Sequence, residues 1–366
     1  MGRTARQDDS VDVLPAGALE QVTGPLRLRR PRADDLAEYT LLHTDPRTYA
    51  HAPEAMPGAL TCRIRLDADL EHWRDHRFGY LAVEEFPSGR LAGWGGLRSH
   101  PHQPDLNLYC RLSPELLGRG YGRLLARALT VSAAEWLPDR AVRASVRRSN
   151  PVSLRTSLSA GLVRIGIDER PDDPPGAVSD LLELPRITAV REVDEDLRAT
   201  LLDLWVRVND SGGSVGFPPG ASRSDVEPVF GEHLAETRDG RAVLGVLREP
   251  DGTVAGFAWW RRRPEPLYAH IATLWRLQVD PERRGRNLGR LLLGGMHALA
   301  RTMPGVELLR LDYRSGSCLG DFYTRAGWVE TGRQPSGLRL GPGAYRDDVA
   351  MMRRVDGDPL VGDGQT

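Results

Sequence analysis

Apolar and polar residues follow two different periods along this chain, and together they predict both strands and helices. Short runs that are apolar or alternate with period two, bounded by Gly, Pro and Asp, predict β-strands. These runs lie at residues 26–31, 80–85, 90–97, 106–112 and 142–146, and then at 242–247, 254–260, 274–279 and 307–312. Apolar residues spaced three and four apart predict helices at about 36–43, 123–136, 151–160, 194–209 and 288–303. Because helices and strands do not alternate regularly, we expect α+β domains, each a mixed, mostly antiparallel twisted sheet flanked by helices.

The order of these elements occurs twice. Matched glycines stand 167, 166 and 163 positions apart: Gly122 with Gly289, Gly161 with Gly327, and Gly93 with Gly256. A nearly constant offset across three separate elements indicates that a whole domain is duplicated. The boundary is expected near Leu184–Arg186, which gives domains over residues 25–186 and 187–355. Residues 1–24 and 356–366 are polar and without a sustained period, so we expect a mobile arm and a mobile tail.

Composition narrows the classes of function. A length of 366 residues suits two domains, and a net charge of −1 gives no overall basic field for nucleic acid or an anionic membrane. Three cysteines are too few and too scattered for a disulfide framework or a zinc site: Cys62, Cys110 and Cys318. No apolar run is long enough to cross a bilayer, and the N-terminus lacks a signal-peptide core. We therefore expect a cytoplasmic protein that needs no metal.

A basic, glycine-containing turn stands between the strand at 274–279 and the helix that begins at Leu288. The first amides of a helix lack partners within it, and the macrodipole adds partial positive charge there. Four arginines surround the same turn: Arg283, Arg284, Arg286 and Arg290. Strand, turn and helix in this order predict a pyrophosphate site, and the alternative is an Arg-rich surface turn before an ordinary helix. A Walker-type loop is excluded because the chain contains no Lys.

The segment Arg284-Gly-Arg-Asn-Leu-Gly289 resembles the acyl-CoA signature of the GNAT acetyltransferase superfamily, Arg/Gln-x-x-Gly-x-Gly/Ala, with Asn287 in place of the first glycine. Asn tolerates a left-handed backbone, so we expect the turn to form. The next two elements are also similar to the superfamily's: a strand at 307–312, then a helix ending in Tyr323-Thr-Arg-Ala-Gly-Trp328. The resemblance covers about residues 25–355, as two tandem GNAT domains.

The resemblance implies roles for residues of the second half. The strand end should splay or bulge before Pro281, and the acyl-CoA contacts would come from Leu277, Gln278, Val279, Arg284, Gly285, Arg286, Asn287, Leu288, Gly289 and Arg290. Tyr323 is expected to protonate the departing thiolate, and its alternative role is a core aromatic. Asp312 is the first candidate for the general base, although it could instead cap the next helix. His270 is the second, and its alternative role is structural.

The first half is similar to the branch of the superfamily that acetylates the N-termini of ribosomal proteins. The residues expected to hold CoA there are Cys110, Arg111, Leu112, Leu117, Gly118, Arg119, Gly120, Tyr121, Gly122, Arg123, Asn150 and Ser153. At the position that corresponds to Tyr323, however, this half has Ser157. A serine hydroxyl is shorter and a far weaker acid, so this half is expected to bind CoA without the superfamily's usual proton donor.

The resemblance implies an N-acyltransferase that uses acetyl-CoA or another acyl-CoA, with catalysis in the C-terminal domain and a small-molecule amine as acceptor. The N-terminal domain would bind CoA mainly in a structural or regulatory role. Tandem members include thiol-cofactor biosynthetic enzymes and proteins of antibiotic biosynthesis or resistance. The alternatives are a non-catalytic acyl-CoA sensor and a protein N-terminal acetyltransferase. The protein would act as a monomer or a homodimer.

Overall fold

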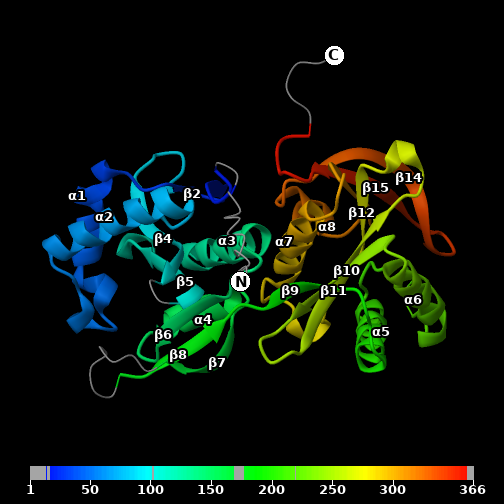
Figure 1. Ribbon diagram of the computed structural model, residues 1–366, viewed down its shortest axis with the longest axis horizontal. Helices are drawn as coiled ribbons and strands as arrows, with labels where there is room; N and C mark the ends of the chain where they lie inside the picture. The colour runs from blue at the N-terminus through cyan, green and yellow to red at the C-terminus, as the bar shows by residue number, and fades with distance from the viewer. Residues whose placement is uncertain (1–13, 15–16, 101–102, 169–176, 219, 361–366) are drawn as a thin grey trace, which may run out of the picture. The chain divides into compact units, whose positions relative to one another are not determined.

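The computed structural model describes residue 14 and residues 17–100, 103–168, 177–218 and 220–360. By its internal contacts the chain divides into two compact units, residues 1–129 and 130–366. The described strands form two sheets, one of eight and one of seven strands, and most of their pairings are antiparallel. Helices flank both sheets (Figure 1). The expected α+β class with mixed, mostly antiparallel sheets is therefore confirmed.

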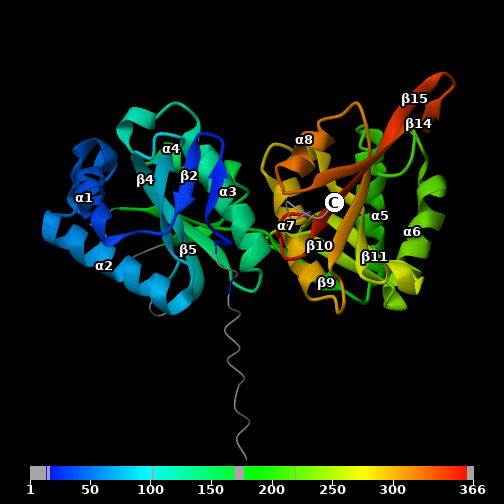
Figure 2. The same cartoon turned by 90° about the horizontal axis from the view of Figure 1, so that it is seen from above.

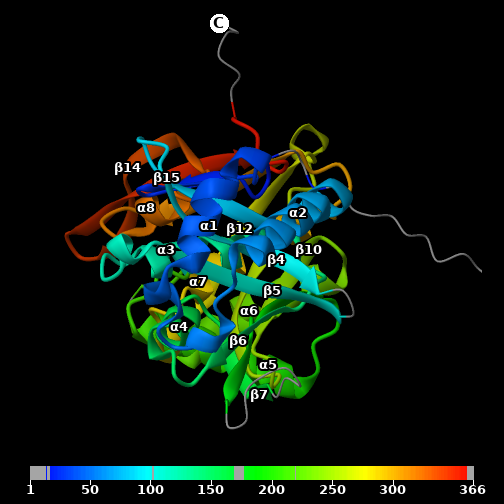
Figure 3. The same ribbon diagram turned by 90° about the vertical axis from the view of Figure 1, so that its left-hand side faces the viewer.

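The first unit is an antiparallel sheet covered by two helices. Its elements are β1 (Gln21–Thr23), β2 (Leu26–Arg29), α1 (Leu36–Thr44), α2 (Ala59–His76), β3 (Tyr80–Glu85), β4 (Leu91–His100) and β5 (Gln103–Leu112), followed by the start of α3 (Tyr121–Trp136). The strands run in the order β1-β2-β3-β4-β5. Helices α1 and α2 lie over this sheet (Figure 3), and their apolar residues pack around Trp94 of β4.

The arm expected over residues 1–24 is shorter than the sequence suggests. Residues Gln21–Thr23 pair with β2 as an edge strand, and Leu19 is buried. Residues 1–13 lie outside the described residues, as do residues 361–366 of the expected tail. A three-residue edge strand carries too little periodicity to be seen in the sequence, which is why the arm was predicted too long.

The second unit holds the rest of the chain. Its first elements are β6 (Val142–Arg147), α4 (Pro151–Ser159), β7 (Val163–Asp168) and β8 (Ser179–Glu183), in the strand order β6-β8-β7. The seven-stranded sheet then has the order β14-β15-β13-β12-β11-β10-β9. Its elements are β9 (Arg186–Val190), α5 (Glu195–Asp210), α6 (Arg223–Arg238), β10 (Ala242–Arg248), β11 (Val254–Arg262), β12 (Ile271–Val279), α7 (Leu288–Arg301), β13 (Leu308–Arg314), α8 (Leu319–Thr324), β14 (Val329–Gly341) and β15 (Ala344–Arg354).

The chain passes from one sheet to the other between Glu183 and Arg186, close to the expected boundary. The two compact units are divided elsewhere, at residue 129, so the domain limits stay a prediction. None of the described helices is long and apolar enough to cross a membrane.

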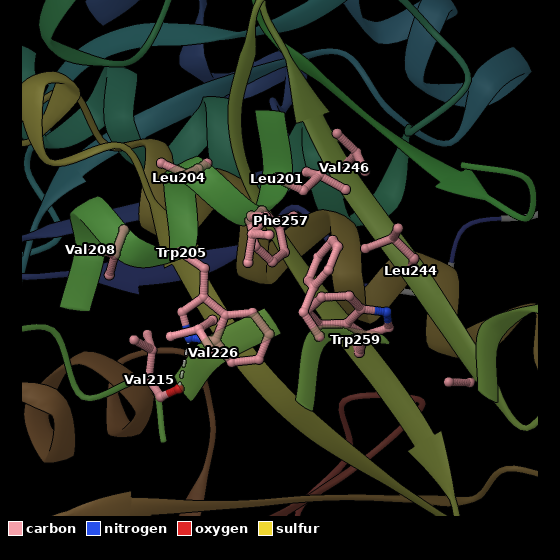
Figure 4. Close-up of a cluster of buried hydrophobic side chains, with 13 residues drawn as sticks. Leu201, Leu204, Trp205, Val208, Val215, Val226, Leu244, Val246, Phe257 and Trp259 are labelled. Carbon is pink, nitrogen blue, oxygen red and sulfur yellow. Dashed lines mark hydrogen bonds between the residues drawn. The ribbon is translucent and has the colours of Figure 1, made fainter. Parts of the chain in front are cut away.

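Helices cover both faces of the seven-stranded sheet. Figure 2 shows α5 and α6 on one face and α7 on the other. On the α5–α6 face, Trp205 and Phe257 are fully buried together with Trp259 (Figure 4). The indole Nε1–H of Trp205 donates a hydrogen bond of 3.1 Å to the carbonyl oxygen of Val215. This bond ties the loop between α5 and α6 to the core, and that loop forms one wall of the candidate site described below.

Replacing Trp205 with Ala should lower the free energy of unfolding by about 3–5 kcal/mol, because it removes a fully buried aromatic ring and leaves a cavity. The measurement is urea unfolding followed by circular dichroism. Leu267, which is 84% exposed, provides the control, since Leu267→Ala should change the same free energy by less than about 0.5 kcal/mol. Equal small effects for both variants would show that Trp205 is not part of the stabilising core.

Candidate functional site

The central strand of the second sheet, β12, is irregular at its middle. Phe257 of β11 lies opposite Gln278, but Trp259 lies opposite Trp275. Two residues of β12 thus face one residue of β11, which is a β-bulge, and Arg276 within it has a left-handed backbone with φ of 55°. The irregularity expected in this strand before Pro281 is confirmed.

Strands β12 and β13 also separate at this point. They pair in parallel from Ile271 with Leu308 to Thr273 with Arg310, and no further. Because β12 continues to Val279 and β13 to Arg314, the two strands diverge over their C-terminal parts. The divergence leaves room between two neighbouring strands of a sheet.

A pocket of about 340 Å³ lies at this separation. Its walls come from the α5–α6 loop, the bulge of β12, the end of β13, helix α8 and the β14–β15 hairpin. The predicted acid Tyr323, the predicted base Asp312 and Leu277 all line it. His270 is not among the lining residues: it precedes β12, at the end where that strand still pairs with β13. The structure therefore brings Tyr323 and Asp312 together, but not His270.

Tyr323 is held on a short helix that a glycine ends. The backbone N–H of Trp328 donates to the Tyr323 carbonyl oxygen at 3.2 Å, and Gly327 between them has φ of 81°. A left-handed glycine is the usual way to end a helix, and the buried Trp328 anchors the turn that follows. Tyr323 itself is 8% exposed, and burial raises the pKa of its phenol. The hydroxyl therefore stays protonated at neutral pH and can donate a proton.

Two carboxylates line the same pocket. Asp312 accepts a hydrogen bond of 2.9 Å from Arg310. Asp348 of β15 lies on the same face as Asp312, since Asp348 pairs with Arg314 and Asp312 pairs with Ala350. Burial, and then the charge of Asp312, raise the pKa of the Asp348 carboxyl. Asp348 was not predicted from the sequence, where its only signal is the acidic pair Asp347–Asp348 in the first half of the last strand.

The turn after β12 has the backbone conformation that the resemblance requires. Gly285 has φ of 82° and Asn287 has φ of 66°, and α7 begins at the next residue. The matched positions of the first half, Gly118 and Gly120, have φ of 77° and 79°. Asn287 thus adopts the left-handed conformation of the glycine it replaces, and the expectation that the turn forms with Asn is confirmed.

Three of the four arginines of this turn have partners within the protein. The buried carboxylate of Glu249 lies 3.4 Å from Arg283 and 3.2 Å from Arg286, so it compensates both charges. Arg284 donates to the hydroxyl of Ser211 at 2.7 Å, a neutral partner. For Arg290, burial and then the charge of Arg325 lower the pKa of the guanidinium. Glu249 lies far from this turn in the sequence, so its pairing with Arg283 and Arg286 could not be predicted from the motif.

The side chain of Asn287 is engaged within the protein. Its amide nitrogen donates to the hydroxyl of Thr130 at 3.2 Å and to the carbonyl oxygen of Ala160 at 3.4 Å. Thr130 is fully buried and itself donates to the same carbonyl at 3.0 Å. The Asn287 amide therefore fixes the start of α7 to its surroundings.

In the first unit the matching strand is regular. From Gly93 opposite Leu112 to Ser99 opposite Leu106, β4 and β5 pair without a bulge. Arg111, expected to contact CoA, donates to the hydroxyl of Tyr109 and to the carbonyl oxygen of Thr48, both at 2.6 Å. Burial raises the pKa of the Cys110 thiol to about 12.

Four further residues expected to contact CoA in the first half also shape the local backbone. Gly118 and Gly120 shape the turn before α3, which begins at Tyr121. The side chain of Asn150 caps α4 by accepting a hydrogen bond of 3.0 Å from the backbone N–H of Ser153. Ser157 is buried in the same helix. Among the described residues no cluster of three or more metal-ligating side chains occurs.

Comparisons with known proteins agree with this geometry. The family model of the acetyltransferase (GNAT) domain matches residues 25–163, and that of the acetyltransferase (GNAT) family matches residues 215–327. Comparison with curated proteins finds no significant match.

Solved structures with a similar fold include three acetyltransferases, all of low sequence identity. A GNAT-family acetyltransferase from Streptococcus pneumoniae is 17% identical over 46% of this chain and 99% of its own, with a TM-score of 0.38. The spermidine N-acetyltransferase of Vibrio cholerae, solved with CoA and spermine, is 16% identical over 47% and 96%, with a TM-score of 0.39. A GCN5-related N-acetyltransferase from Kribbella flavida is 20% identical over 46% and 97%, also with a TM-score of 0.39.

The two family matches together span more than half of the chain. Each covers strands of one of the two sheets and a left-handed turn that precedes a helix. This protein belongs to the GNAT acetyltransferase family, as a member with two tandem domains.

Proposed function

We propose that this acyltransferase transfers an acyl group from acyl-CoA, most simply acetyl-CoA, to a small-molecule amine, with catalysis in its C-terminal half. The observation that carries the proposal is the pocket at the separation of β12 and β13. It holds a protonated phenol, Tyr323, and two carboxylates, Asp312 and Asp348, in one space. A proton donor and acidic groups that attract an amine are what direct acyl transfer to nitrogen requires.

The residues around the bulge and the turn fit acyl-CoA. The left-handed turn leads into α7, whose first amides have no partner within the helix and can donate to a pyrophosphate. Arg290 adds a charge that no carboxylate pairs with among the described residues. The amide of Gln278 is buried and has no hydrogen-bond partner in the described structure, which leaves a donor and an acceptor for a ligand group or water. We propose Leu277, Gln278, Val279 and residues 284–290 as the acyl-CoA contacts.

Acyl-CoA supplies an activated thioester, and the reaction it permits balances without another reagent. The amine nitrogen forms a bond to the thioester carbon, the carbon–sulfur bond breaks, and the products are an amide and free CoA thiol. Asp312, or its neighbour Asp348, takes the proton that the amine loses, and Tyr323 gives a proton to the departing sulfur. Burial raises the pKa of Tyr323, so the phenol is protonated before the step, and the same shift makes it a weaker acid than an exposed tyrosine.

For the N-terminal half we propose binding of CoA without turnover. Its turn has the same left-handed conformation at Gly118 and Gly120, which supports binding. Its strand β5 pairs without a bulge between Leu106 and Leu112, and Ser157 stands where the C-terminal half has Tyr323. The turn proposed to bind the pyrophosphate thus occurs in both halves, whereas the bulge and the tyrosine proposed for catalysis occur, at the matched positions, only in the C-terminal half.

Tyr323→Phe should lower kcat by about 10²–10⁴-fold, because it deletes the proton and keeps the ring's packing. Affinity for acyl-CoA should hardly change. The measurement is release of free thiol from a set of acyl-CoA esters in the presence of a panel of small amines, with direct titration of CoA binding.

Ser157→Ala is the matched control in the other half and should leave kcat unchanged. If Ser157→Ala abolishes turnover and Tyr323→Phe does not, the active half has been assigned wrongly. If the unmodified protein releases no thiol above the hydrolysis background with any amine, the protein is a sensor of acyl-CoA and not an enzyme.

Asn287→Gly should leave CoA affinity within about twofold and should lower the free energy of unfolding by about 1 kcal/mol. The physical reason is that the side chain bonds to Thr130 and Ala160 and only the backbone shapes the turn. Isothermal titration with CoA and urea unfolding measure the two effects. Thr130→Val removes the same contact from the other side and should destabilise comparably. A tenfold change in CoA affinity for Asn287→Gly, in either direction, would show that its side chain reaches the phosphates.

A further inference from the structure

Arg276 is the bulge residue of β12, and it faces the pocket. Its left-handed backbone, with φ of 55°, is a conformation that L-residues with large side chains seldom adopt. A bulge re-aims the side chain it carries, and here it points a guanidinium into a site that also contains Tyr323 and Asp312.

The guanidinium is fixed in place by the α5–α6 face of the sheet. A Cβ atom added at Gly216 would lie 1.9 Å from Nη1 of Arg276, so the guanidinium rests directly against the backbone of the α5–α6 loop. Its carbon Cζ lies 5.6 Å from the ring centroid of Trp205 and 5.1 Å from that of Trp275. Arg276 thus places its side chain on the α5–α6 face of the sheet, whereas α7 covers the other face (Figure 2).

The charge of Arg276 has no counter-ion. Among the described residues no carboxylate forms an ion pair with it, and its buried Nε has no hydrogen-bond partner. Burial, and then the charge of Arg261, lower the pKa of the guanidinium to about 10, so it remains charged at neutral pH. Arg261 itself is paired with Glu236, and Asp312 is paired with Arg310. A charge taken out of water without a partner is costly, and a bound anion would remove that cost.

We propose that Arg276 binds a carboxylate of the acceptor, so that the acceptor is an amine that also carries a carboxylate, such as an amino acid. A guanidinium and a carboxylate match as a planar, two-bond pair. Asp312 and Asp348 on the opposing strands take the ammonium end, and leucines of β12 and β13 line the space between. A volume of about 340 Å³ suits a molecule of that size. This assignment rests on the proposed function, whose acceptor it specifies.

The test uses matched acceptors on the full-length protein. Each of the common amino acids is compared with its carboxamide and with the amine that lacks the carboxyl group, by acceptor-dependent thiol release. The best amino acid should exceed its two analogues in kcat/KM by about a hundredfold or more, because the site would otherwise leave Arg276 unpaired. Arg276→Gln should remove this preference mainly by raising KM, and Arg276→Lys should restore part of it.

Arg263→Gln provides the control, since it removes an exposed arginine next to β11 that already pairs with Glu265. It should leave the preference unchanged. Amides or plain amines used as well as amino acids, or an Arg276→Gln variant with the unaltered preference, would overturn the assignment while the acyltransferase function stands.

A readout that needs no turnover separates the two proposals. Amino acids at millimolar concentration should raise the Tm of the protein loaded with CoA, and Arg276→Gln should lose that shift. If no acceptor of any kind supports thiol release but this shift is seen, the proposed function fails and the carboxylate site remains. If neither the shift nor a carboxylate preference is seen, Arg276 only braces the two tryptophans.

Discussion

Strands β12 and β13 pair in parallel over only three residue pairs, and the chemistry of the site depends on where that pairing stops. Past Thr273 and Arg310 the two strands no longer bond to each other, and the bulge at Arg276 follows three residues later in β12. The space that results opens between two strands of the sheet, and the α5–α6 loop forms one of its walls. Side chains from both strands can therefore be held in fixed positions around a reacting group.

The two halves of the chain share the turn before the helix and differ in the strand that precedes it. Both have the left-handed turn before a helix, at Gly118 and Gly120 and again at Gly285 and Asn287. At the matched position only the second half has a bulge, and the first half has Ser157 where the second has Tyr323. In the first half Arg111, on the regular strand β5, is satisfied by bonds within its own unit. These differences support the proposal that both halves bind CoA and that the C-terminal half carries out the transfer.

Features that depend on the local spacing of residues could be predicted from the sequence. The glycine offsets and the motif around the turn predicted its conformation, and the Tyr-x-x-x-Gly-Trp spacing predicted a helix that carries Tyr323 into the pocket. Features that depend on partners far away in the chain could not be predicted from the sequence. Arg276 gains its position from Gly216 and Trp205, and Arg283 loses its free charge to Glu249. No periodicity or motif encodes such pairings, because they arise only when separate elements pack.

The most direct measurement is a crystal structure of the protein with an unreactive acetyl-CoA analogue. Catalysis in the C-terminal half requires the pyrophosphate at the first amides of α7, the pantetheine chain between β12 and β13, and the sulfur within hydrogen-bond distance of the Tyr323 hydroxyl. An analogue bound only at the turn that precedes α3, or a sulfur atom beyond the reach of Tyr323, would contradict it.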